Sequence, residues 1–141
     1  MRAIGIDLGS VRVGIAISDE LGLMAHPRPH LAGGSLPALL EALAALARDE
    51  SIDHFVVGLP RQLDGTEGRP ARDARRFALA LGQHTGIEVT LCDEWLTTRE
   101  ARARLHAGGK SDKQSRSRID SAAAAVLLQS WLDARPRESS G

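Results

Sequence analysis

A carboxylate lies at the mouth of a predicted hairpin near the start of the chain. Asp7 comes near the end of the first of two strand-like segments, Arg2 to Leu8 and Arg12 to Ser18, which a turn around Gly9 joins. Side chains alternate along a strand, so small residues share the face of Asp7 and leave room around it: they are Ala3, Gly5, Gly14, Ala16 and Ser18. The pattern predicts a site for a metal ion or a phosphate. The alternative is an aspartate that only hydrogen-bonds the backbone of its own turn.

Basic residues concentrate in one later segment, although the whole chain has no net charge. Its 18 Lys and Arg residues balance 18 Asp and Glu residues. Between residues 96 and 118 seven basic residues stand against two acidic ones, a surplus of five. This asymmetry favours a phosphate-backbone partner, with a solvated helix and loop as the alternative. The basic residues are Arg99, Arg102, Arg104, Lys110, Lys113, Arg116 and Arg118.

Length and composition indicate one globular domain. The chain has 141 residues, of which 43% are hydrophobic and 26% charged. A single copy of the hairpin argues against the actin-like ATPases and sugar kinases, which need two such domains. We expect a cytoplasmic protein, because there is no basic and apolar leader and no apolar run near the roughly 18 residues that span a bilayer. The single cysteine, Cys92, excludes an internal disulfide and is expected to pack.

Hydrophobic spacing predicts an α/β order of elements. After the hairpin comes a third strand, Leu23 to Leu31, whose prolines place it at an edge. Leucines at helical spacing then follow a capping residue, Ser35. The later elements are a strand from His54 to Leu59, a loop from Pro60 to Gly68, a helix from Arg69 to His84, a strand from Ile87 to Cys92, a helix from Thr97 to about Ala107, a polar loop from Lys110 to Arg118 and a helix from about Ile119 to Asp133.

This order predicts a mixed sheet in which the first, fourth and fifth strands are parallel. Parallel strands end at the same edge of a sheet, where ligands of open α/β sheets bind. Asp7 ends the first strand, Gly58 to Pro60 end the fourth, and the pair Asp93-Glu94 follows the fifth. The topology therefore gathers acidic side chains at one edge.

Four short segments along the chain form a recognisable series. They are Asp7-Leu8-Gly9 with Arg12-Val13-Gly14-Ile15-Ala16-Ile17-Ser18-Asp19, Val57-Gly58-Leu59-Pro60 with Asp64-Gly65-Thr66-Glu67, Asp93-Glu94 with Leu96-Thr97-Thr98, and Ile119-Asp120-Ser121-Ala122-Ala123-Ala124. In this order they resemble the YqgF/RuvX family, nuclease-like proteins of the ribonuclease H superfamily related to the Holliday junction resolvase RuvC. The resemblance covers nearly the whole chain. It departs at Trp95, where the family usually has arginine after the Asp-Glu pair.

The resemblance implies a fold, a site and a substrate class. The fold is a single ribonuclease H-like domain over residues 1–134, with a five-stranded mixed sheet in the order 3-2-1-4-5 and a frayed tail at 135–141. The family's acidic positions fall on Asp7, Glu94 and Asp120. Nucleic acid would contact basic residues that lie near the site or in the basic segment: Arg12, Arg99, Lys110, Lys113, Arg116 and Arg118.

Three carboxylates suit phosphodiester cleavage. Two divalent ions roughly 3.5 to 4 Å apart can activate a water and stabilise both the attacking and the leaving oxygen, and Mg²⁺ or Mn²⁺ takes oxygen ligands. Asp7 is expected to bridge the ions, with Glu94 and Asp120 each holding one. Simpler roles remain: Glu94 as an acid of a surface loop, and Asp120 as an acid in the first turn of a helix that begins near Ser117.

Three functions are compatible with these residues. The first is a metal-dependent nuclease that processes the 5′ end of precursor 16S ribosomal RNA, with structured RNA and ribosomal particles as partners and no membrane. The second is a resolvase of branched DNA, which favours a homodimer over a monomer. The third is a non-catalytic module that binds nucleic acid or ribosomes. The acidic residues cannot separate the first two, because both would use the same carboxylates.

Overall fold

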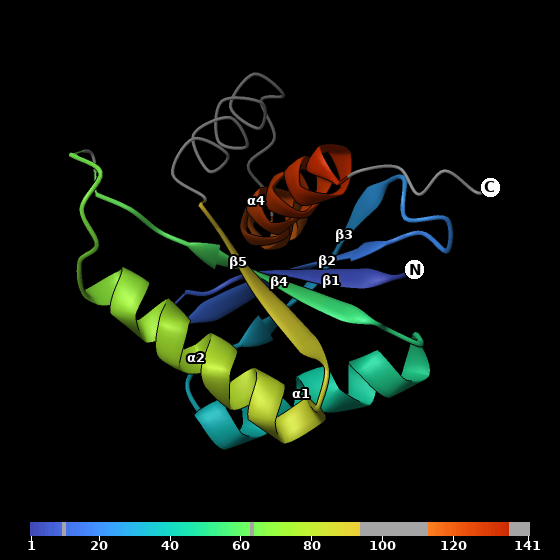
Figure 1. Ribbon diagram of the computed structural model, residues 1–141, viewed down its shortest axis with the longest axis horizontal. Helices are drawn as coiled ribbons and strands as arrows, with labels where there is room; N and C mark the ends of the chain where they lie inside the picture. Colours follow the sequence, from blue (N-terminus) through green and yellow to red (C-terminus); the bar gives the residue numbers. More distant parts are fainter. Residues whose placement is uncertain (10, 63, 94–112, 136–141) are drawn as a thin grey trace.

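Five strands form one mixed sheet in the order β3-β2-β1-β4-β5 (Figure 1). The computed structural model describes residues 1–9, 11–62, 64–93 and 113–135, and in the last range it describes side chains from residue 121 onward. Strand β2 is antiparallel to its two neighbours, whereas β1, β4 and β5 are parallel. The strands are β1 (Ala3–Asp7), β2 (Arg12–Ser18), β3 (Ala25–Ala32), β4 (His54–Leu59) and β5 (Glu88–Asp93). The α/β class and the strand order expected from the sequence are confirmed.

Helices cover both faces of the sheet (Figure 1). Helices α1 (Leu36–Asp49) and α2 (Arg69–Thr85) lie on one face, and α4 (Lys113–Ala134) lies on the other. Helix α1 begins as expected, since the Ser35 hydroxyl accepts a hydrogen bond from the backbone N–H of Ala38 at 3.4 Å. No helix in the described part of the chain has the length and apolar character that a bilayer crossing demands.

Alternation along the strands divides the core into two parts. The bulky face of the hairpin, with Ile4, Ile6 and Ile15, packs against α1 and α2 together with Phe55. The small face packs against α4. The buried residues of this second part of the core come from the sheet and from the helix: Ala3, Ala16, Val56, Ala124, Leu127, Leu128 and Leu132. The small residues that share the face of Asp7 therefore serve first to admit a helix.

Helix α4 lies unusually close to β1. A Cβ atom added to Gly5 would lie 2.7 Å from the Leu128 Cβ atom and 2.9 Å from the carbonyl oxygen of Ala124. These distances are below van der Waals contact, and neither neighbour is the flexible end of a side chain. Close approach to the strand backbone is thus the correct interpretation of Gly5, and the group that approaches is a helix of the same chain.

The start of the last helix differs from the expectation. The sequence predicts a polar loop up to Arg118, but α4 begins at Lys113. Polar side chains conceal this part of the helix from any search for apolar spacing, although Lys, Gln and Arg are good helix formers. Asp120 is consequently the eighth residue of the helix, so the interpretation of this acid as a first-turn capping residue is wrong. The predicted helix from Thr97 to Ala107 lies outside the described residues.

We expect Gly5→Ala to lower the free energy of unfolding by about 1 to 3 kcal/mol, because the new methyl group must displace α4 from the sheet. Urea unfolding followed by circular dichroism measures this change. Gly34→Ala is the matched control, since a Cβ atom at that exposed position meets nothing within 4 Å. Equal effects of the two substitutions would show that the close approach at Gly5 does not constrain the fold.

Candidate functional site

Asp7 lies half-buried at the carboxyl end of β1, between two glycines of the neighbouring strands. Its partner on β2 is Gly14. On the other side Ile6 pairs with Val57 of β4, which brings the following residue, Gly58, beside Asp7. All three lie on the α4 face of the sheet, because Gly5 of the same strand meets α4. The two positions directly beside Asp7 in these strands are thus glycines, which place no side chain next to the carboxylate.

The end of β5 lies two strands from Asp7. Gly58 pairs with Cys92 and Leu59 pairs with Asp93. Cys92 packs on the apolar cluster beneath α4, as expected for a packing cysteine. By alternation Asp93 is on the opposite face, where it bonds Arg61. Two strand spacings amount to about 10 Å, a span that two carboxylates and a pair of ions roughly 4 Å apart can bridge.

Helix α4 runs antiparallel to β1, so its first half lies at the carboxyl end of that strand. In the first half of the helix, Ser121 contacts Ile15, the partner of Ile6 on β1. Two turns later, Gln129 bonds the backbone of Leu23 and Ala25, at the other end of the sheet. The amino-terminal half of α4 therefore approaches the edge at which Asp7 lies.

The position of Asp120 follows from this direction. Asp120 is one helical turn before Ala124 and lies on the same face of α4. The carbonyl of Ala124 lies beside Gly5, and Asp7 is two residues beyond Gly5 in the same direction. One helical turn and two strand residues each cover about 6 Å. The backbone at Asp120 is therefore level with Asp7.

The remaining sequence-predicted residues divide into two groups. Arg12 is exposed at the start of β2, two residues from the Gly14 partner of Asp7. The other described basic positions lie on α4 at residues 113, 116 and 118, and this turns part of the expected basic loop into a basic helix segment. Predicted site residues outside the described residues are Glu94, Arg99 and Lys110, as is Trp95.

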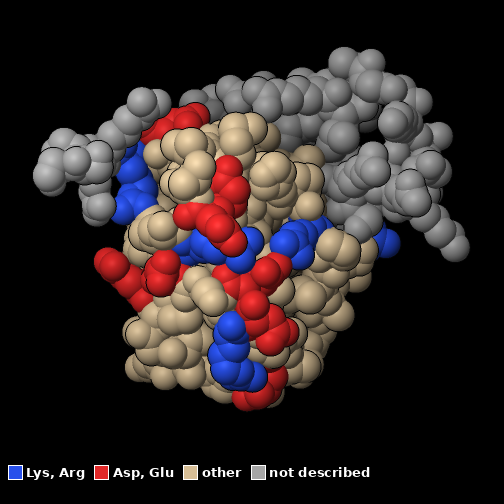
Figure 2. Space-filling model, turned by 90° about the vertical axis from the view of Figure 1, so that its right-hand side faces the viewer, with Lys and Arg blue, Asp and Glu red and all other residues tan. Residues whose placement is uncertain are grey.

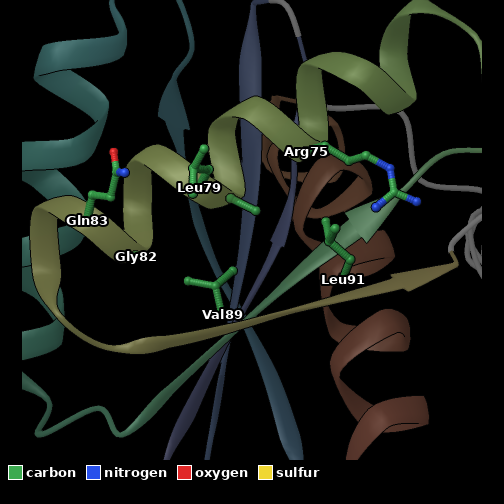
Figure 3. Close-up of a pocket in the computed structure, with 7 residues that line it drawn as sticks. Arg75, Leu79, Gly82, Gln83, Val89 and Leu91 are labelled. Atoms are coloured by element: carbon green, nitrogen blue, oxygen red, sulfur yellow. The ribbon is translucent and has the colours of Figure 1, made fainter.

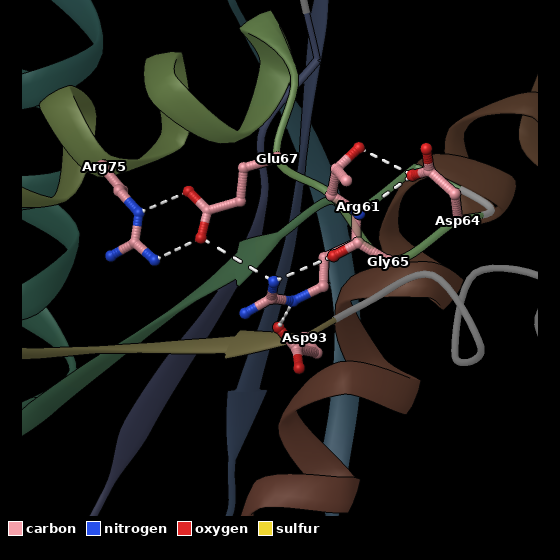
Figure 4. A network of polar contacts seen from close by, with 7 residues as sticks. Arg61, Asp64, Gly65, Glu67, Arg75 and Asp93 are labelled. Atoms are coloured by element: carbon pink, nitrogen blue, oxygen red, sulfur yellow. Dashed lines mark hydrogen bonds and ion pairs between the residues drawn. The ribbon is translucent and has the colours of Figure 1, made fainter.

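A chain of ionic contacts joins the end of β5 to the loop after β4 and to α2 (Figure 4). The Arg61 guanidinium donates from Nε to Asp93 at 2.7 Å and lies 3.8 Å from Glu67. Glu67 in turn accepts two hydrogen bonds from Arg75, at 2.8 and 2.6 Å. This Arg61 network fixes the end of β5, directly before Glu94.

Sequence analysis did not identify the Arg61 network. The sequence leaves two roles for Asp93, a residue that supports the metal ligands or an acid that simply ends a strand, and no spacing rule connects the loop to the first turns of α2. The parallel pairing of Leu59 with Asp93 was the available signal, because it places the residues that follow Leu59 beside Asp93.

Hydrogen bonding sets the charge states in this region. The Arg75 side chain bonds the Glu67 carboxylate and lowers the pKa of that carboxyl below its ordinary value, and the pKa of Arg75 is raised in return. In the same loop the Thr66 hydroxyl and N–H bond the carboxylate of Asp64 and lower its pKa. Both acids therefore stay ionised at neutral pH, and the charge of Glu67 is compensated by Arg75 and Arg61.

Two other surface features lie away from the carboxyl edge. The face beside the amino terminus carries acidic and basic side chains close together (Figure 2). Near the amino terminus, Arg2 pairs with Glu50 at 3.3 Å, and Arg28 pairs with the same carboxylate at 2.6 Å. A groove of about 490 Å³ lies between α2 and β5 (Figure 3) and is lined by residues that include Leu79, Val89 and Leu91. Val89 and Leu91 belong to the core under α1 and α2, so this groove opens on the face opposite Asp7.

Asp7 is the expected metal ligand that the described part of the chain contains with its side chain. Among the described residues, no three His, Cys, Asp or Glu side chains gather closely enough to hold a metal ion. The Asp7 oxygens at the open edge are the donors that Mg²⁺ and Mn²⁺ prefer, so the described part of the site fits such an ion.

Sequence comparison identifies the family. The family model of RuvX, described as Holliday junction resolvase, matches residues 1–134. The chain belongs to the RuvX family. This RuvX-family chain is 45% identical over 135 residues to a protein of Anaeromyxobacter sp. (strain K) named "Putative pre-16S rRNA nuclease", which covers 96% of this chain and 98% of that protein. A protein of the same name from Myxococcus xanthus (strain DK1622) is 43% identical over 140 residues, covering 99% and 93%.

Structure comparison supports the same fold. RuvC of Thermus thermophilus in complex with a Holliday junction substrate aligns with a TM-score of 0.56 and 15% identity, over 96% of this RuvX-family chain and 95% of that chain. The fowlpox virus Holliday junction resolvase aligns with a TM-score of 0.58 and 13% identity, over 96% and 100%. At these identities the likeness shows the fold alone. The expected ribonuclease H-like architecture is confirmed.

We expect the Glu67 carboxyl to titrate below its ordinary pKa of 4.5, because Arg75 bonds its charged form. Its folded pKa is lower than its unfolded one, so Glu67 stabilises the fold above the unfolded pKa and loses this effect as the pH falls through the folded value. Arg75→Gln should raise the pKa of Glu67 toward 4.5, as measured by NMR titration of the carboxyl carbon. Arg72→Gln, at an exposed position of the same helix, is the control and should leave the pKa of Glu67 unchanged. An unchanged pKa of Glu67 in Arg75→Gln would refute the assigned cause.

Proposed function

We propose that this chain is a metal-dependent nuclease that hydrolyses phosphodiester bonds with Asp7, Glu94 and Asp120. The observation that carries the proposal is the position of Asp7, at the carboxyl end of β1 between Gly14 and Gly58 and level with the backbone of Asp120. The names of the relatives support nuclease chemistry. The catalytic domain is assigned to residues 1–134, with residues 135–141 as a tail.

Glu94 completes the proposed set through alternation along β5. Cys92 is on the α4 face and Asp93 on the other, so an extended continuation would return the next residue to the α4 face. The Arg61 network holds Asp93 on the opposite face and thereby supports this alternation.

Each acid has a role in the proposed chemistry. Two bound Mg²⁺ or Mn²⁺ ions would supply an activated water and stabilise charge on the attacking and leaving oxygens. Asp7 ends β1 and would contact both ions. Glu94 and Asp120 would each hold one ion, and exposed Arg12 can orient a phosphate of the substrate.

The preferred substrate is precursor 16S ribosomal RNA, cleaved at its 5′ end. Relatives that are 41 to 45% identical over nearly the whole chain carry the name of that activity. Branched DNA is the second candidate, because the family model and the structural neighbours are described as Holliday junction resolvases. A symmetric junction cutter requires a homodimer, whereas RNA processing allows a monomer that acts on ribosomal particles in the cytoplasm.

Asp7→Asn is expected to reduce cleavage by at least about 100-fold, because an amide removes the negative charge that binds the ions. The assay incubates the purified chain with precursor 16S RNA and, separately, with four-way DNA junctions, in the presence of Mg²⁺ or Mn²⁺. Asp19→Asn is the matched control: Asp19 accepts a hydrogen bond from the Leu23 N–H in the turn after β2, which an asparagine can also accept. Full activity of Asp7→Asn would refute the proposed site.

Replacing Arg116 and Arg118 by Gln should weaken nucleic-acid binding and leave metal binding intact. If both contact phosphates, the slope of log affinity against log salt concentration should flatten by about two units. Fluorescence anisotropy over a salt series measures the slope. Replacing Arg72 and Arg76, two exposed residues of α2, by Gln is the control for the loss of two positive charges and should leave the slope unchanged. An unchanged slope in the Arg116 and Arg118 variant would remove the basic helix segment from the interface.

A further inference from the structure

Ser121 inserts its hydroxyl between two strands of the sheet. The side chain is 1% exposed, and its Oγ atom accepts a hydrogen bond from the backbone N–H of Ile15 at 3.4 Å. The same hydroxyl donates to the backbone carbonyl of Arg28. Ile15 on β2 and Arg28 on β3 are partners in the sheet. A helix side chain thus bonds a donor and an acceptor that face each other across two strands.

The strand pairing is irregular at this point. Val13 pairs with Leu31, but Ile15 pairs with Arg28, so β3 has one extra residue opposite Gly14. The extra length contains Pro29, which has no N–H to donate to the ladder. Such a bulge leaves room for a group from outside the sheet, and the Ser121 hydroxyl occupies it.

Apolar packing on the sheet differs between the two halves of the described part of α4. The residues from Ala122 to Ala125, directly after Ser121, are four alanines and carry little side-chain surface, whereas the leucines that pack on the sheet, Leu127, Leu128 and Leu132, lie further along the helix. The strength of a hydrogen bond falls steeply with misalignment. Beside Ser121, hydrogen bonds can therefore define the position of the helix more sharply than apolar contacts do.

The described tethers of α4 lie mainly at its far end. Gln129 bonds Ala25 and Leu23, and Trp131 stacks on His54 with ring centroids 4.7 Å apart. Gln129 is eight residues, or about 12 Å, from Ser121 along the helix. Among the side chains that the structure describes, Ser121 is the hydrogen-bonded tether nearest the edge that holds Asp7.

We propose that Ser121 is a positioning residue, whose hydrogen bonds in the β2–β3 bulge hold the adjacent Asp120 level with Asp7. Consecutive Cα atoms are 3.8 Å apart, so a fixed Ser121 fixes the backbone of Asp120. A shift of about 1 Å at a catalytic group can cost up to about 100-fold in rate. This role rests on the proposed function, because it requires that Asp7 and Asp120 share a metal site.

The test is Mn²⁺ affinity, measured by titration calorimetry on the purified full chain. Ser121→Ala should weaken Mn²⁺ binding by about 10- to 100-fold, as is typical when a group that orients a metal ligand is lost. Gln129→Ala is the matched control: it removes two hydrogen bonds to the sheet from the far end of α4 and should change affinity by less than about twofold. Ser121→Cys keeps a side chain of similar size with a weak hydrogen-bond donor, so its Mn²⁺ affinity should lie between those of Ser121→Ala and the wild type.

The outcomes separate this inference from the proposed function. Urea unfolding of each variant shows whether Ser121→Ala and Gln129→Ala lose comparable stability; if Ser121→Ala does not fold, Ser121→Cys decides the question. Wild-type affinity in the folded Ser121 variant, with binding lost in Asp7→Asn, would overturn the positioning role alone. Wild-type affinity in Asp7→Asn would overturn the proposed site together with it. Equal loss of affinity in Ser121→Ala and Gln129→Ala would reduce Ser121 to a general stabiliser of α4.

Discussion

Helix α4 rests directly on the backbone of β1, because Gly5 has no side chain to hold it away. A helix that packs this close brings its own residues to the level of the strand ends. The backbone at Asp120 is thereby level with Asp7, although more than 100 residues separate the two in the sequence. Small residues have two uses on this face of the sheet. Near the middle of β1, Gly5 accepts the helix, and at the end of β1 the neighbours of Asp7 are Gly14 of β2 and Gly58 of β4.

The sheet could be predicted because its physical signals are local. Side chains alternate between bulky and small along β1 and β2, and the two parts of the core follow that alternation. Pro27 and Pro29 mark β3 as an edge strand, and the parallel order of β1, β4 and β5 follows from the helix between β1 and β4 and the helix between β4 and β5. The sequence therefore predicts the edge of the sheet at which β1 ends with Asp7 and β5 ends with Asp93.

The contacts that fix the positions of the site residues gave no such signal. Lys113 to Arg118 are helical without an apolar stripe, so periodicity alone misplaces the start of α4. Arg61 follows β4, so the pairing of β4 with β5 brings it beside Asp93, and it contacts Glu67 within the same loop. Neither contact follows from a helical or strand periodicity. Ser121 bonds Arg28 across 93 residues, at a bulge whose existence depends on the register of β2 and β3. Each of these depends on tertiary geometry, which the sequence alone does not reveal.

The same carboxylates serve a phosphodiester whether its sugar is ribose or deoxyribose, because the bond that breaks is the same. Discrimination between RNA and DNA must therefore come from surfaces that meet the sugar, the helix shape or a second strand. In the described part of this chain the residues nearest to such a role are Arg12, exposed beside the carboxylate, and the basic helix segment at the start of α4. The basic segment leads directly into Asp120 and Ser121, so any contact that moves the first turns of α4 acts on the acid that Ser121 holds in place.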